Sequence, residues 1–231
     1  MRLRLNIMLM KEDEMPISAF IQSHKPNPVI LLFISALVVF CSCNVQRAEI
    51  VNPTPVTSAT PQSPEQQKAI RMTELFDRSD CRNFFLEFPA TFVGFSALYG
   101  FDDEKGEAPL YGKSEAHVSF FFDCPEVSKK ERIKKTIGIG LEGKWDADAV
   151  GLFQDLATEL IFANPDDFKS ELESLNESQA SSFWYFILDG PEPHDPEVLK
   201  NYDRLRYLFA DRPKIVKLIK KERERIVAQG H

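Results

Sequence analysis

The chain has no excess of positive charge, because 35 Asp and Glu residues outnumber 28 Lys and Arg residues and give a net charge of −7. Nucleic-acid binding requires a positive field that displaces counterions from the phosphates, so this balance argues against that function. Cysteine is scarce too. The four cysteines lack the close spacing of a zinc site, and we expect no cysteine-bound metal.

Motifs of the common enzyme classes are also missing, since the sequence has no serine elbow, H-E-x-x-H zinc motif or P-loop. Gly138, Gly140 and Gly143 have the spacing of a dinucleotide-binding loop, which works only between a strand and a helix. Because the charged stretch 129–135 precedes them, we interpret them as a helix end and a loop. The acidic residues around Gly106 lack calcium-loop spacing and are expected to form a solvated turn. We expect no cofactor and no metal.

The apolar content is high enough for a packed domain. Hydrophobic residues make up 43% of the chain, which contains 19 Phe. This composition is typical of a globular protein, and the chain is long enough to bury a sizeable core.

Residues 29–43, VILLFISALVVFCSC, form an uncharged and mostly apolar run. A membrane-spanning helix needs roughly 20 apolar residues, so this run is short for a permanent span. It fits the core of a secretory signal, and Lys25 supplies the positive flank. A buried core helix, an uncleaved anchor and an ordinary cleaved signal are alternatives. The preceding leader is unusually long and acidic, so Met15 is an alternative start.

The end of this run, VFCSC at residues 39–43, resembles the lipobox of bacterial lipoproteins, in which a small residue precedes an obligatory cysteine. The resemblance implies that Cys43 is diacylated and becomes the first residue of the mature protein. Phe40 and Cys41 depart from the pattern, because Leu and a small Ala or Ser are commonest there. Two or more acyl chains hold a protein firmly on a membrane. Asn44 replaces the Asp that favours inner-membrane retention, so the resemblance implies the periplasmic face of the outer membrane in a cell that has one.

Residues 44–63 are rich in Pro, Thr and Ser and poor in large apolar groups, which predicts a flexible tether. For residues 64–231 we predict an all-α, compact multi-helix domain. Apolar residues recur there at three-and-four spacing. Three capping-box patterns mark helix starts: Ser63 with Gln66, Ser128 with Glu131, and Asn176 with Gln179.

The expected helices are 64–78, 80–88, 90–99, 113–123, 128–142, 147–163, 165–175, 177–188, 196–210 and 213–228. An aromatic helix end followed by proline occurs at both Phe162 and Phe209. This weak repeat admits an irregular, solenoid-like packing of helical hairpins. The alternative is that helix–proline–helix junctions simply look alike in any helical protein.

Cys81 and Cys124 lie within the predicted domain and would meet an oxidising compartment after export. A disulfide between them would close a loop of 43 residues and stabilise the fold by roughly 4 kcal/mol in the chain-entropy model. Two separate buried thiols are the alternative.

The loop 189–195 is the most unusual in the chain, because it places a histidine among carboxylates and prolines. Its candidate interaction residues are Asp189, Glu192, His194 and Asp195. A His beside carboxylates can act as a base or metal ligand. The same residues can equally end one helix and cap the next, and we favour partner contact over catalysis. His117 is expected to be structural. The last predicted helix has a local charge of +5 over residues 212–225, which indicates a solvated face or, alternatively, docking to an acidic partner or lipid headgroups.

We therefore expect a non-enzymatic, lipid-anchored protein of the bacterial cell envelope whose helical surface binds another envelope protein. One alternative is an envelope hydrolase or metal enzyme that uses His194 or His117 with nearby carboxylates, which would require a pocket where these groups converge. A lipid or ligand carrier would require an enclosed apolar cavity. An immunity-type lipoprotein that blocks a toxin is a further alternative.

Overall fold

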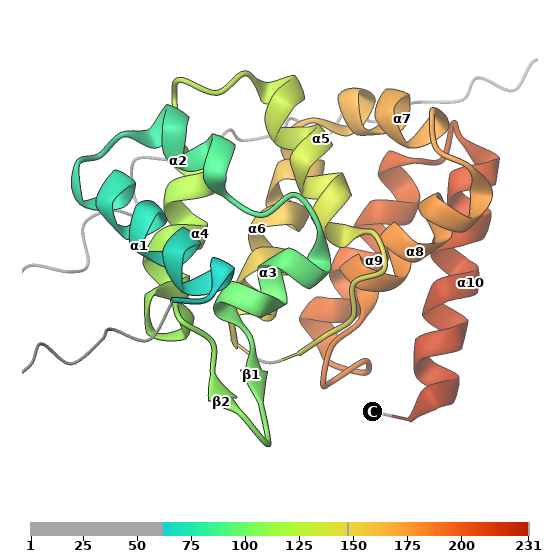
Figure 1. Ribbon diagram of the computed structural model, residues 1–231. Helices are drawn as coiled ribbons and strands as arrows, with labels where there is room; N and C mark the ends of the chain where they lie inside the picture. Colours follow the sequence, from blue (N-terminus) through green and yellow to red (C-terminus); the bar gives the residue numbers. More distant parts are fainter. Residues whose placement is uncertain (1–61, 147, 231) are drawn as a thin grey trace, which may run out of the picture. The chain divides into compact units, whose positions relative to one another are not determined.

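The computed structural model describes residues 62–146 and 148–230. The predicted leader with Cys43, and the tether up to residue 61, lie outside the described residues. The described part of the chain is an all-α domain, as predicted, with one short two-stranded hairpin (Figure 1).

Ten α-helices follow one another along the described residues, each close to its predicted range. They are α1 (Pro64–Asp77), α2 (Cys81–Glu87), α3 (Phe92–Tyr99), α4 (Ser114–Asp123), α5 (Lys129–Gly140), α6 (Asp148–Ala163), α7 (Pro165–Glu173), α8 (Glu177–Leu188), α9 (Pro196–Leu208) and α10 (Pro213–Gln229). A 3-10 turn, η2 (Tyr111–Lys113), precedes α4.

Local hydrogen bonds explain where several helices begin. At the start of α1, Ser63 Oγ accepts the backbone N–H of Gln66 at 3.2 Å, and the Gln66 side chain accepts that of Ser63 at 3.0 Å. The predicted capping boxes of α5 and α8 are present as well. α7 differs, because the Asn164 side chain forms no cap and its amide donates to the carbonyl of Leu160.

The hairpin of β1 (Phe101–Asp102) and β2 (Gly106–Glu107) was not predicted as a pair of strands. It forms at the acidic turn. Asp102 Oδ1 accepts the backbone N–H groups of residues 104 and 105, and Gly106 adopts a φ of +82°, which favours glycine. Two residues per strand are too few to show an alternating pattern in the sequence. The hairpin projects from the helices (Figure 1).

Helices two positions apart in the chain pack against each other along most of the domain. The pairs are α1 with α3, α2 with α4, α3 with α5, α4 with α6, α5 with α7, α6 with α8, and α8 with α10. Other helices pack together as well, including α1 with α2 and α5 with α8, so the described helices form a compact multi-helix domain. α10 packs chiefly on α8 rather than on its neighbour α9.

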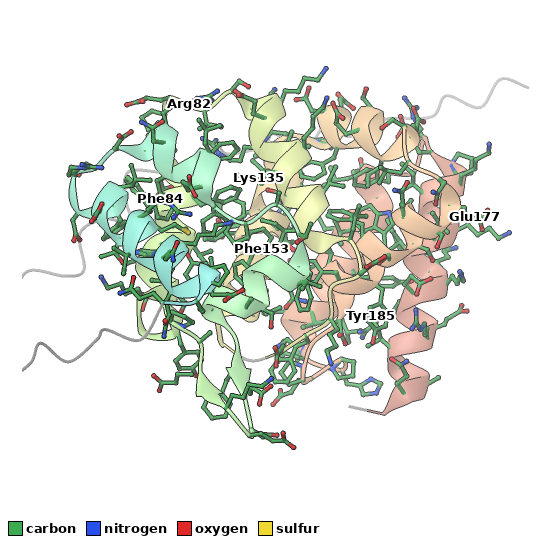
Figure 2. All side chains as sticks on the ribbon, viewed as in Figure 1. Arg82, Phe84, Lys135, Phe153, Glu177 and Tyr185 are labelled. Carbon is green, nitrogen blue, oxygen red and sulfur yellow. A yellow bond between two sulfur atoms is a disulfide. The ribbon has the colours of Figure 1, made fainter. Side chains whose placement is uncertain are left out.

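Aromatic rings fill much of the core between these helices. The Phe88 ring lies 6.0, 5.7 and 4.5 Å from the ring centroids of Phe95, Tyr99 and Phe121, and all four side chains are at most 1% exposed. Phe153 of α6 contacts the same cluster, and Figure 2 shows it among the side chains packed between helices. Burying one such side chain stabilises the fold by roughly 2 kcal/mol.

A disulfide joins Cys81, the first residue of α2, to Cys124, which directly follows α4. Their Cα atoms are 5.5 Å apart, and both residues are buried in the core. The bond therefore ties the start of α2 to the end of α4 across 43 residues of chain.

The glycines at the end of α5 lie where neighbouring elements approach closely. A Cβ added at Gly138 would lie 2.8 Å from the carbonyl oxygen of Ala90, and one at Gly140 would lie 2.8 Å from the Phe183 ring. The glycine spacing that resembles a dinucleotide loop therefore reflects close packing at a helix end.

Candidate functional site: the hollow beside residues 189–195

The loop between α8 and α9 contains the four predicted interaction residues, and two of them hold it in place. Asp189 is 7% exposed, and its Oδ2 accepts the backbone N–H of Trp145 at 2.7 Å. Asp195 Oδ1 accepts the backbone N–H of Glu197 at 2.8 Å and so caps α9. These two carboxylates act structurally, as the alternative reading of the sequence expected.

The other two predicted residues are available to a partner. Glu192 and His194 are exposed, and neither side chain forms a hydrogen bond or ion pair with a described residue. The loop therefore exposes the Glu192 carboxylate and the His194 imidazole, while hydrogen bonds of Asp189 and Asp195 hold its ends in place.

This loop borders a hollow of about 380 Å³, which α6, α9 and the segment before α6 also line. Trp145, which is 38% exposed, and Tyr202 bring aromatic surface to it, beside Asp155 and Asn201. The sequence pattern indicated the loop as a candidate contact site but none of these four residues. Trp145 was the one residue whose position in the sequence could have indicated the hollow, because it lies in a predicted loop and such a large apolar side chain is usually buried.

Buried side chains hold the walls of the hollow. Gln154 of α6 is 6% exposed, and its Nε2 donates to the carbonyl oxygens of Phe186 and, at 2.9 Å, Asp189. Arg223 of α10 is also buried and donates to the carbonyl oxygen of Pro193 in the middle of the loop. Because these bonds reach the loop backbone at two places, the hollow is formed before any ligand arrives.

The charge of the lining is negative. Its charged residues are Asp155, Asp189, Glu192 and Asp195. Partial burial, reinforced by the charge of Glu159, raises the pKa of the Asp155 carboxyl. The Tyr202 ring already contacts Arg206 and Arg223, whereas the exposed ring of Trp145 can attract a further cation, so the hollow is complementary to a positively charged group.

His117, the other histidine singled out from the sequence, lies elsewhere. It is fully buried in α4, with its ring 4.7 Å from that of Phe76 and 5.2 Å from that of Phe84. The Tyr99 hydroxyl lies 3.1 Å from Nδ1. Burial, with a smaller effect of the Lys113 charge, lowers the pKa of His117 to about 4. His117 does not line the hollow, so the structure does not bring it together with the loop.

Within the described ranges, no three His, Cys, Asp or Glu side chains are placed to share a metal ion. None of the helices seen in residues 62–146 and 148–230 has both the length and the hydrophobicity of a membrane span. Comparison of the chain with protein-family models, with curated proteins and with solved structures found no match.

Proposed function

We propose that this chain is a lipid-anchored protein of the bacterial cell envelope whose helical domain binds a partner protein and accepts a basic side chain of that partner in the hollow beside residues 189–195. The anchoring part rests on the likeness of residues 39–43 to a lipobox. The binding part rests on one observation: a preformed hollow combines acidic lining with the exposed ring of Trp145.

The dimensions of the hollow favour a side chain over a larger ligand. Its volume of about 380 Å³ lies near the lower end of the range for small-molecule sites. Long cationic side chains can place their methylene groups against Trp145 while the charged end meets Asp155 or Glu192. Interface energy commonly concentrates in such an anchor inserted into a pocket.

The enzyme alternative has less support from the geometry. His117 is enclosed by aromatic rings, and His194 is exposed to solvent beyond the lining of the hollow. No described carboxylate forms a hydrogen bond with either ring, as an oriented general base would require.

Palmitate labelling of expressing cells tests the anchor. We expect the full chain to incorporate label, Cys43→Ala to lose it, and Cys41→Ala to keep it. Label that persists in Cys43→Ala would refute the proposed acylation site.

Site-specific photo-crosslinking tests the binding site. A photoreactive phenylalanine analogue at Trp145 should give a crosslinked partner in intact cells, whereas the same analogue at Leu86, an exposed residue of α2 that lies outside the hollow, should not. Asp155→Asn combined with Glu192→Gln should weaken the Trp145 crosslink and leave the fold intact, because neither side chain pairs with a described residue. A crosslink that the double variant leaves unchanged would contradict a cationic anchor.

A further inference from the structure

The groove between α9 and α10 is a second surface that the hollow does not involve. It encloses about 940 Å³, and its floor includes Pro213 and Val216. Tyr207, which is 82% exposed, stands at the groove. An aromatic side chain so exposed beside apolar floor residues is typical of a contact surface.

Two cations of this groove have no partner in the domain. Lys217 and Lys220 line it, and neither forms an ion pair or hydrogen bond with a described residue. Elsewhere the surface lysines of α5 do find carboxylates: Lys129 lies 2.5 Å from Asp167. The lining also includes Arg206 and Lys221 against the carboxylates of Asp203 and Glu224, so four cations and two anions give the groove a net positive charge.

The hairpin of β1 and β2 has the complementary character. Asp103, Glu104 and Glu107 are exposed, and none forms an ion pair with a described residue. Phe101 is 47% exposed and lines the same shallow surface as Val93, which is 73% exposed. The hairpin therefore offers acidic side chains together with apolar ones, and it projects from the helices (Figure 1).

We propose that the hairpin of one copy of this chain docks into the α9–α10 groove of a second copy. Unpaired carboxylates would meet Lys217 and Lys220, and Phe101 would meet the apolar floor beside Tyr207. The two surfaces belong to different elements, so the contact is head-to-tail and each copy can both donate a hairpin and accept one.

A hairpin with two residues in each strand offers a small contact surface, whereas stable interfaces bury more than about 1,200 Å². Confinement on a membrane raises the effective concentration of the copies. In this respect the inference rests on the proposed lipid anchor, and the experiment below separates the two.

Cysteine crosslinking of the full chain in cells tests the contact. Co-expressed Glu104→Cys and Lys217→Cys chains should form an oxidised product of two chains. A chain with both substitutions should form dimers or a ladder of larger products. Either variant alone should form none, and neither should Glu104→Cys with Arg78→Cys, which lies outside both surfaces.

Charge reversal gives the specificity control. Lys220→Glu should reduce the crosslinked fraction about threefold, and adding Asp103→Lys should restore it. No product from the Glu104–Lys217 pair, or a product unaffected by reversal, would overturn the inference. A crosslink from Lys217→Cys to a different protein, or to lipid, would also overturn it. If the chain is labelled with palmitate but gives no crosslink, self-association is refuted and the proposed anchor is not. If Cys43→Ala loses both the palmitate label and the crosslink, the contact between copies depends on the anchor.

Discussion

The buried histidine of α4 predicts how the stability of the domain depends on pH. His117 is neutral in the folded protein, because a charged imidazolium would sit among the rings of Phe76 and Phe84. The Tyr99 hydroxyl lies 3.1 Å from Nδ1 of His117 and can donate to it when the imidazole is neutral. Protonating Nδ1 would remove that acceptor.

The magnitude follows from the difference in proton affinity between the two states. The pKa of His117 is lowered from 6.5 to about 4 on folding. The unfolded chain therefore binds the proton more tightly, and the histidine's contribution is complete above pH 6.5 and is lost as the pH falls towards 4. Between pH 7 and pH 5, the free energy of unfolding should fall by about 2 kcal/mol from this group alone.

Urea unfolding at pH 7 and pH 5 measures this effect, with His117→Gln as the matched variant. Glutamine stays neutral at both pH values and can accept from Tyr99. At pH 7 the variant should be less stable than the wild type by about 1–3 kcal/mol, because the buried ring contacts are lost. At pH 5 the gap should shrink by about 2 kcal/mol, since only the wild type loses stability through this group. A gap that is the same at both pH values would refute the buried neutral histidine.

Three further predictions concern the stability of the same domain. Replacing Cys81 and Cys124 with Ala should lower the free energy of unfolding by roughly 4 kcal/mol, and a reducing agent should then affect the urea midpoint of the wild type only. Gly143→Ala should lower the free energy of unfolding by about 1–3 kcal/mol, because the added Cβ would overlap an aromatic ring of α8. Gly112 has open space around it, so Gly112→Ala should leave the thermal midpoint almost unchanged. Equal losses of stability in the two variants would argue against close packing at Gly143. Glu222 is 1% exposed and lies 3.3 Å from the charged groups of both Lys221 and Arg225. Glu222→Gln keeps an oxygen that can accept from the buried serine of α8 but removes the charge, so it should lower the thermal midpoint by an amount equivalent to about 1–3 kcal/mol; no change would show that the two ion pairs contribute little.

The proposed lipid anchor and the two proposed contact surfaces fit together as follows. An anchor at Cys43 would hold the domain near a membrane, and the residues 44–61 between them are rich in Pro, Thr and Ser. Both the hollow beside residues 189–195 and the α9–α10 groove include residues of α9, but they have no lining residue in common. One copy could therefore contact a partner protein and another copy at the same time.

The sequence by itself determined where the helices begin and end. Capping residues such as Ser63, Ser128 and Asn176 satisfy backbone amides only three residues away, so their effect is written in a few consecutive residues. The apolar spacing of the segments between them indicated which faces would be buried, and the all-α class followed from both.

Only the tertiary structure decided which residues from different helices and loops lie side by side. The hollow takes Trp145, Asp155, Asp189 and Tyr202 from separate elements, and no local pattern relates them. The same holds for His117, whose pKa depends on rings contributed by other helices. Such contacts join residues far apart in the chain, so their energies depend on how the helices pack rather than on the hydrogen bonds that form each helix.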